Sequence, residues 1–269
     1  MHGLGNDFMI IDARNFEPKL NYKLIKALSN RNFGVGFDQL VLIYEPTQPN
    51  TDCFLKFWNS DGSKASTCGN ATRCVAALIL HEKRTTTAVI QTEVNLLTCK
   101  RNKQGVISVN MGTPKLLWND IPLAIECDTL NLPLDRNPVA TSMGNPHCTF
   151  FVENLESEDL DYFGNSFENH QLFTNKTNVQ LAQILSVDKI KVKVWERGVG
   201  KTLASGSSAC AVAVAAFRRG LTGKKTQIIM DGGQLEIFWS CDGVWMAGET
   251  RQVFEGTVSN DFLWHIERV

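Results

Sequence analysis

Residues 203–216 read LASGSSACAVAVAA, a turn of small residues that runs directly into a stretch of alanine and valine. A helix of this composition is apolar nearly all round, so we expect it to be buried on all sides. The uncharged apolar stretch from Thr202 to Phe217 has 16 residues, whereas a membrane-spanning helix needs about 20. The stretch therefore predicts a core helix, with Ser205 immediately before it.

An equivalent stretch lies earlier in the chain. TCGNATRCVAALIL (67–80) resembles ASGSSACAVAVAAF (204–217) and pairs Cys68 with Ser205 at an offset of 137 residues. Two further pairs of segments match in the same order and at similar spacing, and they pair Asn6 with Asn145 (offset 139) and Gly112 with Gly248 (offset 136). Three ordered matches at nearly one spacing indicate that the chain consists of two related halves.

Strand-like segments dominate both halves, and many are bounded by Gly, Asn or Asp. They are FMIID, LVLIYE, CFLKFW, AVIQTE and GVISVNM in the first half, and CTFFVEN, NVQLAQIL, KIKVKVWE, TQIIM, QLEIFW and GVWMAG in the second. Each half also contains one nearly uniformly apolar helix, at residues 70–81 and 206–217. A helix of this kind must be surrounded by other elements.

The sequence therefore predicts an α/β (α+β) fold of two pseudo-symmetric halves. In each half a curved, mostly antiparallel or mixed sheet would wrap around a central buried helix, with the active site in the cleft between the halves. We place the first half at residues 1–113 and the second at 114–252. Residues 253–269 are expected to return to the first half.

Composition excludes several classes of function. The chain has 269 residues, 43% of them hydrophobic, and a formal net charge of −1. Without a basic surplus, nucleic acid is not an expected partner. The start, MHGLGNDFMIID, shows neither the basic segment nor the long apolar run of a signal peptide. With no stretch of membrane length, we predict a cytoplasmic protein with no membrane partner.

Eight cysteines in such a chain indicate reduced thiols in a reducing compartment. No C-x-x-C occurs, and Cys68 and Cys74 are six residues apart, which on a helix turns them to different faces. The sequence therefore predicts no metal site. Most of the cysteines are expected to be small core residues.

The two helix starts carry the chemistry. The first turn of a helix presents backbone N–H groups without intrahelical partners and about half a positive charge. A carboxylate can be held there, and a thiol placed there has a lowered pKa. Cys68 and Ser205 stand at these two places. Ser205 could alternatively be a plain N-cap, a role that serine fills well.

Two acid/base groups that face opposite sides of one carbon can invert it without a cofactor. One group removes a proton while the other delivers a proton to the opposite face. Because a Cα–H is a very weak acid, the carbanion needs stabilisation by helix starts and hydrogen bonds in a site closed to water. A thiolate suits this task, since its pKa can lie near the working pH.

Seven motifs resemble the diaminopimelate epimerase family, in order and along nearly the whole chain. They are HGLGNDF (2–8), GFDQL (36–40), FWNSDGS (57–63), CGNATRC (68–74), SMGNPH (142–147), WERGVGKT (195–202) and ASGSSACA (204–211). The resemblance implies a cofactor-independent isomerase that interconverts LL- and meso-diaminopimelate, a step of lysine and peptidoglycan synthesis. It also implies a cytoplasmic homodimer with the two-half fold described above.

The resemblance also implies roles for individual residues. Cys68 matches one catalytic cysteine, Ser205 stands where the family has the other, and His147 and Glu196 match the residues that assist the two thiols. Cys210 matches a second cysteine of the same motif that is not catalytic. The residues implied to bind the substrate, through side chains or backbone amides, are Asn6, Gln39, Asn59, Gly69, Asn70, Asn145, Asn178, Glu196, Arg197, Gly206 and Ser207.

Ser205 admits two hypotheses. It is either an engineered Cys→Ser change that silences one half of the proton relay, or a natural residue of an inactive or repurposed relative. A hydroxyl is a far weaker acid than a thiol, so both hypotheses predict severely reduced epimerase turnover.

Two alternative functions remain open from the residues. The chain could bind an amino acid without turnover, or act as a racemase-family lyase, a dehydratase that uses Cys68 and Ser205. A pyridoxal-phosphate racemase would need a Schiff-base lysine; chemistry alone does not exclude Lys201, but no other feature supports it.

Overall fold

The computed structural model describes residues 1–65 and 68–268, which form two compact units. Unit 1 consists of Met1–Val109 and Glu249–Val269, and unit 2 of Asn110–Gly248. These bounds lie four residues before the boundaries placed from the sequence at 113 and 252. No helix among the described residues is long and apolar enough to cross a membrane.

Unit 1 is built on a mixed sheet in the order β1-β2-β3-β4-β6-β7-β8, with β5 paired to β4. The strands are β1 (His2–Gly3), β2 (Asn6–Asp12), β3 (Gln39–Tyr44), β4 (Cys53–Asn59), β5 (Lys64–Ala65), β6 (Thr87–Gln91), β7 (Leu96–Arg101) and β8 (Ile107–Asn110). The pairs β2·β3 and β4·β6 are parallel, and the other pairs with assigned registers are antiparallel.

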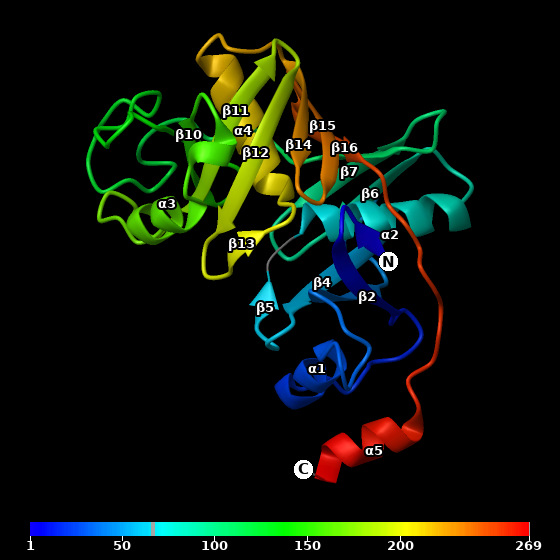
Figure 1. Ribbon diagram of the computed structural model, residues 1–269. Helices are drawn as coiled ribbons and strands as arrows, with labels where there is room; N and C mark the ends of the chain where they lie inside the picture. Colours follow the sequence, from blue (N-terminus) through cyan, green and yellow to red (C-terminus); the bar gives the residue numbers. More distant parts are fainter. Residues whose placement is uncertain (66–67, 269) are drawn as a thin grey trace. The chain divides into compact units, whose positions relative to one another are not determined.

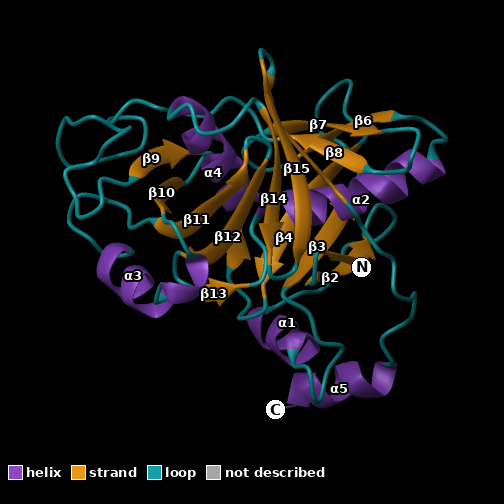
Figure 2. Cartoon of the chain, turned by 45° about the horizontal axis from the view of Figure 1, so that its top comes forward, coloured by secondary structure: helices purple, strands orange, loops and turns teal. Residues whose placement is uncertain are grey.

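Helix α2 (Gly69–Glu82) packs against β1, β2, β6 and β7 of this sheet (Figure 1). Ten of its 14 residues are buried, and three of these, Asn70, Thr72 and Arg73, have polar side chains. Helix α1 (Tyr22–Ser29) covers a smaller cluster around Ile25 and Leu28. Helix α5 (Asn260–Arg268) packs beside α1 (Figure 2), and Phe262 contacts that cluster.

Unit 2 repeats this plan with the order β9-β10-β11-β12-β14-β15-β16 and with β13 paired to β12. The strands are β9 (Val139–Ser142), β10 (Pro146–Phe151), β11 (Asn178–Ser186), β12 (Lys189–Glu196), β13 (Gly200–Thr202), β14 (Lys225–Met230), β15 (Gly233–Ser240) and β16 (Gly243–Gly248). The parallel pairs are β10·β11 and β12·β14, at the places that β2·β3 and β4·β6 occupy in unit 1. The predicted mixed sheet with one central buried helix is confirmed for each unit.

Helix α4 (Gly206–Arg218) is the buried helix of unit 2 and contacts strands from β9 to β16. Strands β10 and β11 have two distinct faces. One face buries Cys148, Phe150, Val179 and Leu181 against the aromatic side of α3 (Leu160–Phe167). The other face, one residue out of step along each strand, is polar and contacts the first turn of α4 through a side-chain hydrogen bond.

The two central helices and the main strands agree with the sequence prediction to within a few residues. Helices α1, α3 and α5, the 3₁₀ turn η1 (Leu155–Ser157) and strands β1, β5, β7, β9 and β13 were not predicted. Local signals for α1 and α3 exist. Asn21 and Asp159 cap them by accepting backbone hydrogen bonds, and apolar residues then recur at helical spacing.

Candidate active site

Cys68 occupies the N-cap position of α2. Its backbone is extended (φ −149°, ψ 112°), and its side chain makes no capping hydrogen bond. The residue is partly exposed, whereas burial raises the pKa of Cys53 and of Cys74 to about 12. The positive end of the helix can stabilise a thiolate at Cys68. The two buried thiols stay protonated and contribute to the packing.

A chain of side-chain amides surrounds the start of α2, where Gly69 and Asn70 are both buried. The Nη2 of Arg73 donates to Asn70 Oδ1 at 2.7 Å, and Asn70 Nδ2 donates to Asn6 Oδ1 at 3.3 Å. Asn6 Nδ2 in turn donates to a carboxylate oxygen of Asp38 at 2.9 Å. Each amide is therefore oriented by its neighbours beside the helix start.

Gln39 and Asn59 form a second pair in unit 1, because they lie opposite each other on β3 and β4. Gln39 Nε2 donates to Asn59 Oδ1 at 2.9 Å, and Asn59 Nδ2 donates to Ser63 Oγ at 3.0 Å. Among the residues predicted for unit 1, the structure thus joins Asn6 with Asn70 and Gln39 with Asn59.

Ser205 holds the same position on α4 that Cys68 holds on α2. Its backbone is extended (φ −137°, ψ 120°), and it precedes Gly206 and Ser207, the first two residues of the helix. Ser205 does occupy the N-cap position, but its side chain makes no capping bond, so the expectation that the hydroxyl caps the helix is wrong. The hydroxyl instead donates to Glu196 Oε2 at 3.1 Å, and only 4% of the residue is exposed.

Asn178 holds the turn that carries Glu196 and Arg197. Its Oδ1 accepts from the backbone N–H of Arg197 at 3.0 Å, and its Nδ2 donates to the carbonyl of Pro146 at 2.8 Å. The guanidinium of Arg197 donates to the carbonyl of Asn175 at 2.7 Å. One amide therefore connects the strand that follows Asn145 to the turn that bears the charged residues.

Glu168, just beyond α3, fixes the other side of the same turn. Its carboxylate accepts from Trp195 Nε1 at 2.7 Å and from the backbone N–H of Gly198 at 3.0 Å. The residue is 8% exposed, so these bonds replace most of its contact with water. Glu168 thereby holds the side chain of Trp195 before Glu196 and the backbone of Gly198 after Arg197.

His147 lies completely buried on β10. Its Nε2 is 2.9 Å from Asn145 Oδ1, and its Nδ1 is 3.0 Å from Gln180 Nε2. Burial, with a smaller effect of Arg197, lowers the pKa of His147 to about 3. The imidazole is therefore neutral near pH 7. The thiol-assisting role that the resemblance implies for His147 stays a prediction.

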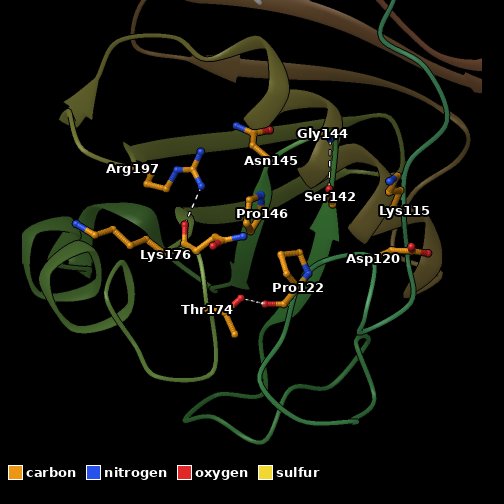
Figure 3. A pocket seen from close by; sticks show the side chains of 11 residues that line it. Lys115, Asp120, Pro122, Ser142, Gly144, Asn145, Pro146, Thr174, Lys176 and Arg197 are labelled. Carbon is orange, nitrogen blue, oxygen red and sulfur yellow. Dashed lines mark hydrogen bonds between the residues drawn. The ribbon is translucent and has the colours of Figure 1, made fainter. Parts of the chain in front are cut away.

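A cavity of about 640 Å³ lies beside Asn145 and Arg197 in unit 2 (Figure 3). Three cationic side chains, Lys115, Lys176 and Arg197, line it together with one carboxylate, Asp120. A ligand with a carboxylate group suits this excess of positive charge. The remaining lining residues are Pro122, Ser142, Gly144, Pro146, Thr174 and Asn175.

The sequence reasoning missed two side chains of this site, Glu168 and Gln180. Gln180 does carry a signal, since a polar residue interrupts the apolar run on a strand that is buried at five successive positions. Glu168 carries no local signal, because its partners follow it by 27 and 30 residues. Across the described part of the chain, no group of three or more His, Cys, Asp or Glu side chains could hold a metal ion.

Solved structures support the fold. The probable proline racemase from Agrobacterium radiobacter K84 superimposes with a TM-score of 0.65 at 11% identity, over 97% of this chain and 92% of that one. A phenazine biosynthesis protein of the PhzF family from Bacillus anthracis gives a TM-score of 0.63 at 14% identity, over 92% and 91% of the two chains. At such identities the likeness concerns the fold alone.

Sequence relatives are much more similar. The diaminopimelate epimerase of Gluconobacter oxydans is 46% identical over 260 residues, which cover 96% of this chain and 97% of the relative. The diaminopimelate epimerase of Rhodospirillum centenum is 44% identical over 268 residues, with coverages of 98% and 92%. The diaminopimelate epimerase family model matches residues 1–117 and 139–253. The chain therefore belongs to the diaminopimelate epimerase family.

Proposed function

We propose that this protein is an isomerase that interconverts LL- and meso-diaminopimelate by proton transfer at Cα, without a cofactor. The observation that carries the proposal is the pair of equivalent helix starts. Cys68 and Ser205 occupy the same N-cap position in two units of the same topology, and neither side chain is used to cap its helix. Relatives that align over 92% or more of both chains at 44% and 46% identity carry the epimerase name.

The reaction divides between the two positions. A thiolate at Cys68 removes the α-proton and leaves the electron pair on Cα, and a proton delivered to the opposite face completes the inversion. The N–H groups at Gly69-Asn70 and Gly206-Ser207 would hold the reacting carboxylate and stabilise the charge that develops on it. The amides of Asn6, Gln39, Asn59, Asn145 and Asn178, with Glu196 and Arg197, would bind the remaining ammonium and carboxylate groups.

Ser205 directs its proton toward Glu196. A thiol at this position would have the same carboxylate as its proton acceptor, which could help to form the thiolate. The weak acidity of the hydroxyl still predicts low turnover. The comparisons bear out neither this impairment nor the two alternatives, an amino-acid-binding relative and a lyase. The impairment stays a prediction.

The test follows solvent deuterium and stereochemistry together, in the chain as written and in its Ser205→Cys variant. We expect the variant to invert both isomers and to incorporate deuterium at the inverted carbon. The parent should exchange deuterium without comparable inversion, because one thiolate can remove a proton and return a deuteron on the same face. Cys241→Ser, at an exposed cysteine, is the matched control and should change neither rate.

Two outcomes would contradict the proposal. If the Ser205→Cys variant neither exchanges nor inverts either isomer, the protein acts on another substrate or only binds. If the parent inverts as fast as the variant, the position of Ser205 is not an acid/base position.

We also propose, from the resemblance, that the protein is a cytoplasmic homodimer with no nucleic-acid or membrane partner. Sedimentation of the purified chain should give about twice the mass of 30.0 kDa. A monomer at every concentration would contradict the dimer.

A further inference from the structure

The side chain of Gln180 uses both ends of its amide inside the fold of unit 2. Its Nε2 donates to His147 Nδ1 at 3.0 Å and to Ser208 Oγ, on the first turn of α4, at 3.1 Å. Its Oε1 accepts from Thr149 Oγ1 at 3.2 Å. Gln180 and its three partners are all fully buried. The amide is therefore held in one orientation, with its NH₂ group toward the imidazole.

This orientation determines which nitrogen of His147 carries the proton. An amide NH₂ group can only donate, so Nδ1 must be the acceptor. The proton of the neutral ring then lies on Nε2, which donates to Asn145 Oδ1 at 2.9 Å. The other arrangement would place a lone pair of Nε2 against the amide oxygen. Gln180 thus sets the tautomer, and the tautomer sets the direction of the Asn145 amide.

The internal repeat provides a comparison within the same chain. The β2·β3 register and the alignment of α2 with α4 make Phe8, Ile10, Val41 and Ala71 the unit 1 counterparts of His147, Thr149, Gln180 and Ser208. All four counterparts are apolar, and three of them are buried. Apolar packing is therefore sufficient to build this position of the fold. The polar set in unit 2 costs desolvation that the fold does not require.

We propose that Gln180 is a positioning residue, which holds His147 as the Nε2–H tautomer and thereby orients Asn145 at the binding site. With Oδ1 engaged by His147, Asn145 can offer its Nδ2–H groups to a ligand in the cavity that it lines. Those groups suit a carboxylate oxygen and not an ammonium. This assignment rests on the proposed function, whose substrate carries both kinds of group.

In this arrangement His147 has no lone pair available as a base. The Nδ1 lone pair accepts from Gln180, and Nε2 bears the proton. We therefore assign His147 to the relay that orients Asn145. Proton removal from the substrate then falls to Cys68.

The test reverses the donor at Gln180. In Gln180→Glu the carboxylate can only accept, so His147 should change to the Nδ1–H tautomer and the Asn145 amide should turn over. Gln180→Met removes the donor with little change in length, and it should leave a mixture of tautomers. The matched control is Gln183→Glu on the same strand, because the Gln183 side chain accepts from Leu155 N–H at 3.2 Å. Glutamate preserves that contact.

Two readouts decide the outcome. Long-range ¹H–¹⁵N spectra of the imidazoles report the tautomer without any need for turnover, and the signal lost in His147→Phe identifies His147. Calorimetric titration with meso-diaminopimelate reports binding. We expect Nε2–H in the parent and in Gln183→Glu, and Nδ1–H in Gln180→Glu with binding weakened about tenfold or more, the effect of losing a hydrogen bond to a charged group.

An Nδ1–H signal in the parent, or an unchanged tautomer in both Gln180 variants, would overturn the proposal. A changed tautomer with unchanged binding would overturn the connection to the site. If the parent does not bind meso-diaminopimelate, the proposed function fails, while the spectra still decide whether Gln180 sets the tautomer.

Discussion

A substitution at Gly164, in the middle of α3, tests whether that helix supports the turn that carries Glu196 and Arg197. A Cβ added at Gly164 would overlap three atoms of the Trp195 indole, Cδ2, Cε3 and Cε2. The indole cannot move away without lengthening its 2.7 Å bond to Glu168, the residue that also holds the N–H of Gly198. Gly164→Ala should therefore strain the hydrogen bonds that hold the turn around Glu196.

One favourable and two unfavourable contributions decide the size of the change in the free energy of unfolding. Helix propensity alone favours alanine over glycine by about 1 kcal/mol. Overpacking costs about 1–3 kcal/mol, and loss of a hydrogen bond to a charged acceptor costs about 1.5–3 kcal/mol. We therefore expect Gly164→Ala to lower the free energy of unfolding by roughly 1.5 to 5 kcal/mol. Substrate affinity should fall as well, because Glu196 and Arg197 follow the displaced indole.

Urea unfolding of Gly164→Ala measures this loss, with Gly223→Ala as the matched control. An added Cβ at Gly223 meets nothing within 4 Å, so the control should be stabilised by about 0.4–1 kcal/mol. In a Trp195→Ala background the overlap disappears, and Gly164→Ala should then become favourable. If Gly164→Ala is as stable as the parent with Trp195 present, the support of the turn by α3 is refuted.

Three further predictions concern the site and its dependence on pH. Cys68→Ala, made in the chain as written, leaves no thiol at either helix start and should abolish deuterium exchange. Retention of more than about 1% of the rate, the lower part of the usual contribution of general acid–base catalysis, would exclude Cys68 as the base. Arg14→Met should lower stability by about 1 kcal/mol at neutral pH. Hydrogen bonds from Arg14 hold the pKa of Asp12 and of Glu82 below their ordinary values. The difference in unfolding free energy between variant and parent should therefore persist above about pH 4 and vanish as the pH falls through the lowered pKa values. A difference that stays constant during acid unfolding would contradict this prediction. Burial lowers the pKa of His147 to about 3, so below about pH 6.5 the unfolded chain binds a proton that the folded chain does not, and the free energy of unfolding should fall by up to about 1.4 kcal/mol per pH unit. Denaturant titrations across this range should show a smaller dependence of stability on pH for His147→Phe than for the parent. An unchanged dependence would assign the acid sensitivity to other groups.

The fold was accessible from sequence because its main signals are local and occur twice. The apolar helices at 70–81 and 206–217 have compositions that only burial explains, and the repeat offsets place them in equivalent surroundings. The observed pairing agrees, since β2·β3 and β10·β11 are the same parallel pair at equivalent positions. Short elements such as β13 were missed, because a strand of three residues formed by pairing to β12 has too few residues for a pattern.

The sequence predicted the candidate site residues from their chemical type, but it did not predict their hydrogen-bond partners. Asn178 and Asn145 have the same side-chain amide, so the sequence assigns substrate binding to both of them equally. The structure separates them: Asn178 uses both ends of its amide on backbone groups, and Asn145 has its oxygen on His147. The hydrogen bonds of the Asn178 side chain join residues 32 and 19 positions apart, and the His147 ring that holds the Asn145 oxygen is itself in contact with Gln180, 33 positions away. No local pattern of a single sequence specifies such contacts.

The repeat explains why the two helix starts can differ in chemistry on a shared scaffold. In unit 1 the start of α2 carries a hydrogen-bonded row of Arg73, Asn70 and Asn6, and Phe8 stands where unit 2 has His147. Unit 2 places Glu196 within 3.1 Å of the Ser205 hydroxyl, where the strand register of unit 1 has Asn59. The equivalent strand positions therefore carry a carboxylate in unit 2 and an amide in unit 1. Asn59→Glu would give unit 1 the same acceptor, and we expect it to shift the pH dependence of exchange by Cys68 upward, because a second negative charge nearby disfavours a thiolate.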